Sequence, residues 1–184
     1  MYLRGAFKQH EYGDVILPFV VLRRMDCVLE DTKDDVIRTY KQFKHTLPDL
    51  NQILMKSAKD LKFYNTSYYD LRRLTQDAAN IEMNFYNYIN GYSPNVREIL
   101  ESFNIDKIVA KLVKNDYLFK LVDKFTEVDL HPEMVSNHEM GYIFEELLRR
   151  FSEMSNETAG EHYTPREVGL CTWHLIPTQI QAVE

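Results

Sequence analysis

The sequence contains few glycines, prolines and cysteines: six, six and two among 184 residues. So little glycine leaves no glycine-rich nucleotide loop of the Rossmann or P-loop type. Cys27 and Cys171 are too few and too far apart for a disulfide framework or a zinc finger, and we expect two buried thiols. The N-terminus lacks the apolar core of a signal peptide, and no apolar run approaches the ~20 residues that span a bilayer. We therefore expect a cytoplasmic protein.

Positive charge is also in short supply. Lys and Arg number 22 against 28 Asp and Glu, which gives a formal net charge of -6. A global basic field that would draw the chain onto nucleic acid or an anionic membrane is therefore excluded, and any DNA contact must be local or supplied by partners. A hydrophobic content of 45% suffices for one sizeable core, or for one core and the start of another.

What the sequence does contain is an apolar periodicity of three and four residues along most of its length, which is typical of α-helices. No strand pattern rises above it, so the predicted fold class is all-α, a multi-helix N-terminal domain. The expected helices cover residues 11–29, 34–45, 48–58, 77–90, 94–103, 106–113 and 117–126. Because Pro18 lies inside the first of these, we expect a kink or a later start there.

The best-specified helix comes late in the chain. Ser136 and Glu139 form a capping box, in which each side chain bonds the backbone N–H of the other residue. One face is then held by Met140, Ile143, Phe144, Leu147, Leu148 and Phe151. The polar stretch 152–162 is expected to be a loop, and a second capping box opens at Thr164, with Pro165 at the first helical position.

Motifs for metal or hydrolytic chemistry are incomplete. His138 and Glu139 begin like the zinc-protease helix motif, but Tyr142 stands where the second His is needed, and the six His are scattered. The Gly-x-Ser-x-Gly elbow of hydrolases is missing. The adjacent carboxylates at 34–35 and 145–146 diverge on a helix and are expected to be solvated. We predict no metal site and no catalytic residue.

Two features of the sequence could contact a ligand: pairs of arginines and a predicted helix start. Arginine pairs occur at residues 23–24, 72–73 and 149–150, and each could form salt bridges with carboxylates, or contact phosphate or a partner. The segment 160–166 combines a glycine, an aromatic residue and a helix start. Such a start presents unpaired N–H groups to a carboxylate, beside the aromatic wall of Tyr163. An ordinary capped helix is the alternative interpretation.

Several collinear blocks resemble the modification (M) subunit of type I restriction-modification systems. The strongest covers residues 155–168, SNETAGEHYTPREV, preceded by MGYIFEELLRRF at 140–151. Upstream, LRG at 3–5, the opening helix with VILPFVVLRRMD at 15–26, and FYNTS at 63–67 are similar to the same family in the same order. Several long blocks in the right order are much more specific than any one short motif.

The resemblance implies an adenine-specific N6 DNA methyltransferase that uses S-adenosyl-L-methionine. It implies a helical domain over residues 1–154, and over 155–184 a linker and the first helix of a Rossmann-like catalytic domain. In that family the segment bordering the methionine part of the cofactor corresponds here to Glu161, His162, Tyr163, Thr164, Pro165 and Arg166. The implied partners are a specificity (S) subunit that reads the DNA sequence, a second M subunit, a restriction subunit and double-stranded DNA. The resemblance also implies that the helical domain closes over the DNA. It implies no membrane.

The sequence also departs from that family. It begins almost at the Leu-Arg-Gly block, and neither the glycine-rich cofactor loop nor the Asn-Pro-Pro-aromatic motif is present, so we expect no methyl transfer by this chain alone. A non-catalytic helical module that docks on the S subunit is the alternative. The gene sequence downstream of Glu184 would distinguish the two. An unrelated helical bundle would require the collinear blocks to be coincidence.

Overall fold

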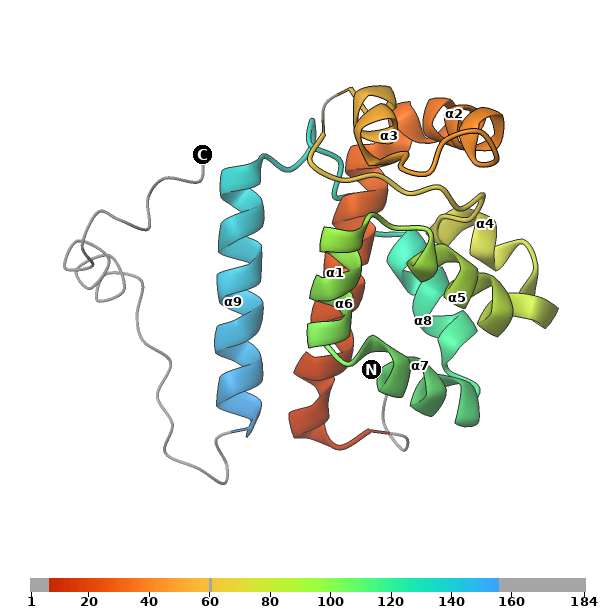
Figure 1. Ribbon diagram of the computed structural model, residues 1–184. Helices are drawn as coiled ribbons and strands as arrows, with labels where there is room; N and C mark the ends of the chain where they lie inside the picture. Colours follow the sequence, from red (N-terminus) through yellow and green to blue (C-terminus); the bar gives the residue numbers. More distant parts are fainter. Residues whose placement is uncertain (1–6, 60, 156–184) are drawn as a thin grey trace.

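The computed structural model describes residues 7–59 and 61–155, and these ranges are helical, with no strand among them (Figure 1). The predicted all-α class is confirmed. The α-helices are α1 (Tyr12–Leu29), α2 (Lys33–Phe43), α3 (Asn51–Ser57), α4 (Leu71–Thr75), α5 (Ile81–Asn90), α6 (Pro94–Ser102), α7 (Ile105–Lys114), α8 (Leu118–Thr126) and α9 (Asn137–Ser155). Short 3-10 turns precede α1, α2 and α5, at Gln9–Glu11, Glu30–Thr32 and Ala78–Asn80.

Most helix boundaries lie within a few residues of those expected, and the exceptions have local causes. Helix α3 begins at Asn51 and not at residue 48, because the Asp49 carboxylate accepts the Asn51 N–H (2.9 Å) and forms a turn there. Helix α4 was not expected, since five residues are too few for a helical period. Its start is set by Asp70, whose side chain accepts the Arg73 N–H at 2.8 Å.

Pro18 lies inside an uninterrupted α1, so the later start considered from the sequence is wrong. Proline has no N–H to give to the carbonyl four residues earlier, which belongs to Asp14. Asp14 is exposed, in the first turn of the helix, so water can take the place of the missing donor.

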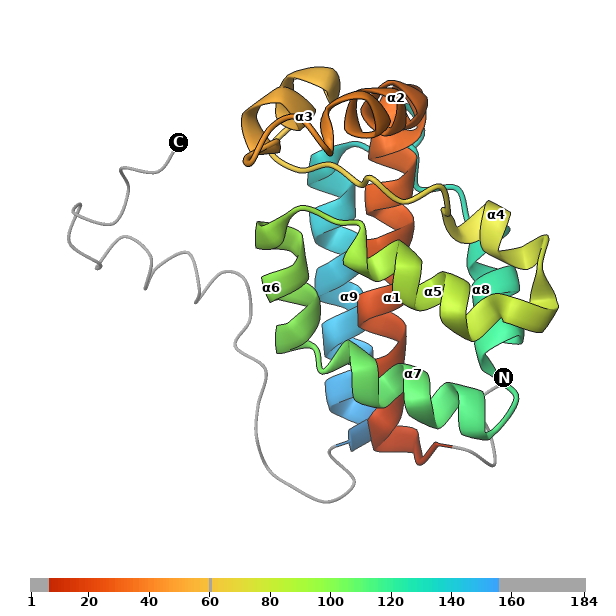
Figure 2. The ribbon, with the colours of Figure 1, turned by 45° about the vertical axis from the view of Figure 1, so that its right-hand side comes forward.

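Helix α1 forms the axis of the molecule. It has α9 on one side and α7 and α8 on the other, as both views show (Figures 1 and 2). Val15, Phe19 and Leu22 are almost completely buried along it. The Phe19 ring lies 5.6 Å from the rings of both Phe85 on α5 and Phe125 on α8, centroid to centroid, so aromatic contacts join three helices at the centre of the core.

Helices α2 and α3 pack together at one end of the molecule and have a small core of their own (Figure 2). Its fully or nearly buried members are Val36, Leu54, Ala58 and Tyr64, separate from the main cluster. We call residues 33–59 the α2–α3 hairpin.

The turn after the hairpin is fastened to the end of α5. The Thr66 N–H donates to the Gly91 carbonyl (2.8 Å), and the Ser93 N–H donates to the Tyr64 carbonyl (3.0 Å). A Cβ on Gly91 would lie 2.7 Å from the Ser67 backbone nitrogen, closer than such atoms approach in proteins. Glycine is therefore required here by the close passage of two backbones. Residues 61–70, which form no helix, connect the hairpin to α4.

Helix α9 begins with the predicted capping box: the Ser136 N–H donates to the Glu139 carboxylate (2.8 Å), and the Glu139 N–H donates to the Ser136 hydroxyl (3.3 Å). It continues to Ser155, so the loop expected from residue 152 is wrong for 152–155. A Cβ on Gly13 would lie 3.1 Å from the Phe151 side chain, which shows how closely α9 approaches the start of α1.

Candidate functional site

The segment predicted to contact a cofactor lies outside the residues that the structure describes. Glu161, His162, Tyr163, Thr164, Pro165 and Arg166 all fall in 156–184, together with the second capping box and Cys171. Their role stays a prediction. The boundary predicted at 154/155 between the two domains also stays a prediction.

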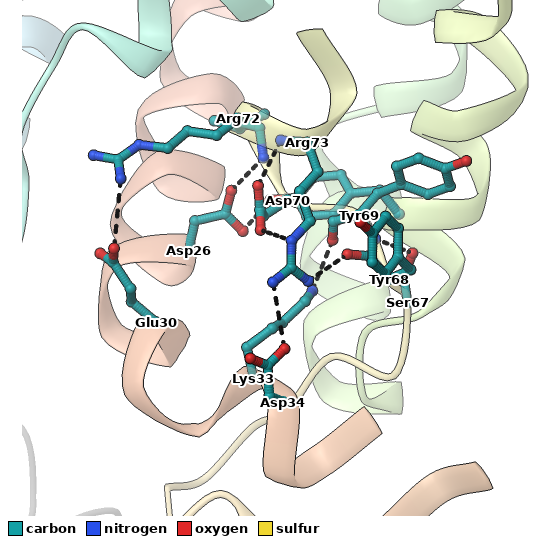
Figure 3. A network of polar contacts seen from close by, with 12 residues as sticks. Asp26, Glu30, Lys33, Asp34, Ser67, Tyr68, Tyr69, Asp70, Arg72 and Arg73 are labelled. Carbon is teal, nitrogen blue, oxygen red and sulfur yellow. Dashed lines mark hydrogen bonds and ion pairs between the residues drawn. The ribbon is translucent and has the colours of Figure 1, made fainter. Parts of the chain in front are cut away.

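The described residues bring together a different polar cluster, between the end of α1 and the start of α4 (Figure 3). At its centre the buried Asp26 carboxylate accepts three hydrogen bonds, from the Leu71 N–H (2.8 Å), the Tyr88 hydroxyl (2.8 Å) and the Tyr92 hydroxyl (3.3 Å). The two tyrosine hydroxyls are 2.7 Å apart and are themselves hydrogen-bonded. Asp26 therefore joins α1 to α4 and α5.

Lys33 adds a buried positive charge to this cluster. Only 7% of the residue is exposed, and its Nζ donates to the Tyr69 carbonyl at 2.7 Å. The same ammonium lies 5.9 Å from the centre of the Tyr88 ring, within the range of a cation–π interaction. The turn at 67–69 is thereby fixed to the start of α2.

Burial dominates the protonation of both groups. It raises the pKa of the Asp26 carboxyl to about 6, against the lowering effects of the Leu71 N–H, Lys33 and the Tyr88 hydroxyl. It lowers the pKa of the Lys33 ammonium to about 8, while Asp26 and Asp70 act in the other direction. The pKa values of Tyr88 and Tyr92 are raised well above their ordinary value, first by burial and then by the Asp26 charge. Both tyrosines thus keep their protons at neutral pH: Tyr88 donates to Asp26, and the Tyr92 proton is available to the Tyr88 hydroxyl at 2.7 Å or to Asp26 at 3.3 Å.

A cleft of about 270 Å³ opens beside this cluster, and several of its charged residues form ion pairs. Arg73 bridges Asp70 and Asp34, at 3.3 Å each, and Arg72 lies 3.5 Å from Glu30. These contacts, together with the Asp26 hydrogen bonds, join α4 to the end of α1 and the start of α2. Little in the sequence indicates this cluster, because Asp26 and its partners are 45 to 66 residues apart.

The first arginine pair has a role that neither sequence-based interpretation included. Arg23 is 4% exposed and donates from Nε to the Val128 carbonyl at 2.6 Å. Arg24 is 8% exposed and donates to the carbonyls of Leu130 (2.6 Å) and Val135 (2.7 Å), and to the Asn137 side chain (2.7 Å). These side chains bind backbone carbonyls and the Asn137 amide oxygen, and neither forms an ion pair with the residues that the structure describes. They fasten the linker 127–136, and with it the start of α9, to α1.

The other two arginine pairs form salt bridges, as one of the two interpretations predicted. Arg72 and Arg73 do so in the cleft described above. On α9, Arg149 and Arg150 both reach Glu146, at 2.8 and 2.6 Å, and Arg149 also pairs with Glu153. These bonds, first those from Arg149, lower the pKa of Glu146 to about 2. Since the side chains of all four residues are 44–68% exposed, the network organises the outer face of α9 and adds little stability.

The described ranges contain neither a metal-binding cluster nor a membrane-spanning helix. No group of three or more His, Cys, Asp or Glu side chains within 7–59 and 61–155 is placed to hold a metal ion. None of the helices in these ranges is long and apolar enough to cross a membrane.

Comparison with known proteins gives two matches in tandem. Residues 2–125 match the family described as HsdM N-terminal domain, and residues 135–183 match the family described as N-6 DNA Methylase. The chain is 25% identical, over 187 aligned positions, to the Type I restriction enzyme MjaIX methylase subunit of Methanocaldococcus jannaschii. That alignment covers 90% of this chain and 32% of the relative, so the chain spans about a third of the relative's length. No solved structure matches.

Proposed function

Because this chain belongs to the HsdM N-terminal domain family, and forms the N-terminal part of a type I restriction-modification methylase subunit, we propose that it serves DNA closure and subunit assembly in a DNA adenine-N6 methyltransferase. Its proposed partners are the specificity subunit, a second methylase subunit, the restriction subunit and double-stranded DNA. S-adenosyl-L-methionine would supply the methyl group in the assembled enzyme. Residues 161–166 are proposed to form one edge of its site.

One observation carries the assembly role: α9 opens the methylase-matched region and is bound firmly to the helical domain. The Phe151 side chain lies against Gly13, and Arg24 bonds the Val135 carbonyl and Asn137 at the start of the helix. The direction of the chain as it leaves the helical domain is therefore set by α1. A catalytic domain placed after α9 would be oriented by these contacts.

Exposed apolar side chains on α9 and on the linker before it support a protein contact there. Leu148 is 43% exposed and Met134 is 69% exposed, while Ile143, Phe144 and Leu147 pack against the core and remain partly exposed. Apolar surface next to a tightly fixed helix favours association with another protein surface. We propose that this face contacts the rest of the methylase assembly.

Co-purification with a type I specificity subunit tests the assembly role. Leu148→Asp is expected to reduce recovery of the complex, because a charge is placed in the apolar contact. Met83→Asp is the matched control, since Met83 is 66% exposed on α5, away from α9. Equal recovery with both variants would contradict the proposed face.

Calorimetric titration with S-adenosylmethionine tests whether residues 161–166 contact the cofactor. The variant is Tyr163→Ala, and the control is Tyr68→Ala, which removes an exposed tyrosine shortly before α4. Saturable binding that is lost only in Tyr163→Ala would support a half-site at 161–166. Binding equal in both variants would contradict it. Assembly without any cofactor binding would favour the alternative function, a helical module that docks on the specificity subunit.

A further inference from the structure

Positive charge is concentrated in one part of this acidic chain. Residues 36–65 contain six basic residues and only two acidic ones, Asp49 and Asp60, which gives a local net charge of +4. The basic residues are Arg38, Lys41, Lys44, Lys56, Lys59 and Lys62. The remainder of the chain has 16 basic and 26 acidic residues, a net charge of -10. The segment is therefore opposite in sign to the rest of the protein.

The fold places most of this charge at one end of the molecule: five of the six basic residues lie on the α2–α3 hairpin, and Lys62 follows it (Figures 1 and 2). All five lysines are exposed, and none of them has an ion-pair partner among the described residues. Arg38 alone is paired, with Asp35 at 3.0 Å. The hairpin's own apolar cluster packs α2 against α3, and it includes Tyr64, whose carbonyl accepts the Ser93 N–H, so these charges project from a folded surface.

A groove of about 380 Å³ runs between the hairpin loop and the start of α6. Lys44, next to α2, and Arg97, on α6, both line it and are exposed. Tyr40, Tyr64 and one acidic residue, Asp49, line it as well. The Lys62 backbone is fastened beside Arg97's helix by the Asn95 side chain, which donates to the Lys62 carbonyl at 2.9 Å. Positive charge thus continues from the hairpin across the groove.

Asn51 lines the same groove, and its side-chain NH₂ group is a donor suited to a phosphate oxygen. Its Oδ1 has no hydrogen-bond partner in the described part of the chain, but protein atoms enclose it, so this oxygen does not itself meet a ligand.

We propose that this groove binds a backbone phosphate of double-stranded DNA between Lys44 and Arg97, with the hairpin lysines along the neighbouring phosphates. The inference rests on the proposed DNA role and assigns the surface that performs it. Contacts of this kind position a protein on DNA without reading its sequence. They displace condensed counterions, so their number can be counted from the salt dependence of binding.

The test compares Lys44→Gln/Arg97→Gln with a matched control, Lys107→Gln/Lys114→Gln. The control removes two exposed lysines of α7, at the opposite end of the molecule, that form no ion pair with the described residues (Figure 1). Affinity of the 184-residue chain for a short DNA duplex is measured by fluorescence anisotropy over a salt series. We expect the groove variant to bind about ten-fold more weakly at low salt, with the slope of log K against log salt reduced by about two. The control should keep the wild-type values.

Thermal melts of both variants show whether they remain folded, as exposed substitutions should. Equal losses of DNA affinity in the two variants, or no loss of affinity in the groove variant, would overturn the assignment of the groove as a phosphate site. Tighter binding of single-stranded RNA than of the duplex would overturn the choice of double-stranded DNA. Absence of duplex binding by the wild type would instead contradict the DNA part of the proposed function itself.

Discussion

Replacing Arg24 by Ala should detach the linker 127–136 from α1. The guanidinium makes three short hydrogen bonds, to the carbonyls of Leu130 and Val135 and to the Asn137 side chain, and the residue is only 8% exposed. The substitution removes the donors and leaves acceptors without partners. Breaking such a buried, charged network costs about 3–5 kcal/mol in the free energy of unfolding.

The assay is thermal unfolding followed by circular dichroism, with hydrogen exchange as a local readout. For a chain of this size, each kcal/mol lowers Tm by about 2–4 °C, so a fall on the order of 10 °C is expected. Amides of α9 should lose protection earlier than those of α5, because α9 depends on the linker. Arg24→Lys should fall in between, since one ammonium cannot reproduce the planar fork of donors.

Arg38→Ala is the control, because Arg38 has a 76% exposed side chain and one surface ion pair. Its Tm should stay close to that of the wild type. If Arg24→Ala has the same Tm as Arg38→Ala, Arg24 does not fasten α9 to α1. The same follows if the α9 amides of Arg24→Ala keep wild-type protection from hydrogen exchange.

Three other positions have outcomes set by the geometry. The Asp26 pKa is raised to about 6 from 3.8, so between about pH 4 and pH 6 only the folded state keeps this proton. The free energy of unfolding, measured by urea titration, should therefore fall by about 3 kcal/mol as pH rises through that window. Asp26→Asn should lack this fall. The Lys33 pKa is lowered to about 8 from 10.5, so stability should rise with pH between these values in the same assay, but not in Lys33→Met. Gly91→Ala should lower Tm because the added Cβ meets the Ser67 backbone. Gly141→Ala, whose Cβ would have nothing within 4 Å on the exposed face of α9, should raise the free energy of unfolding by about 0.5–1 kcal/mol. A Gly91→Ala variant as stable as the wild type would contradict the close approach of the two backbones.

Local rules predicted the helices well. Apolar periodicity located α1 and the helices from α5 to α8, and the Ser136–Glu139 capping box fixed the start of α9, because each signal lies within a few residues of the structure it specifies. The end of α9 was missed by a few residues, since Ser152, Glu153 and Ser155 are polar, but Met154 packs against the core and the helix continues through it.

The polar interior could not be predicted in the same way. Arg23 and Arg24 bind backbone carbonyls more than 100 residues away, and a carbonyl has no signature in the sequence. Asp26 carries no local signal of its role, because its partners Leu71 and Tyr88 lie on α4 and α5. The predicted site at 161–166 came from a resemblance and a helix-end argument, and it remains to be tested.

The clamp that Arg23 and Arg24 form on the linker has a consequence for how this region can change in evolution. Because both arginines recognise main-chain oxygens, the identity of an exposed side chain such as Val128, which is 42% accessible, is of little importance to the clamp. The spacing between residues 128, 130 and 135 is fixed, since each carbonyl must meet one nitrogen of the pair. The linker should therefore accept many substitutions but no insertion or deletion. Relatives whose linkers differ in sequence should keep the same linker length.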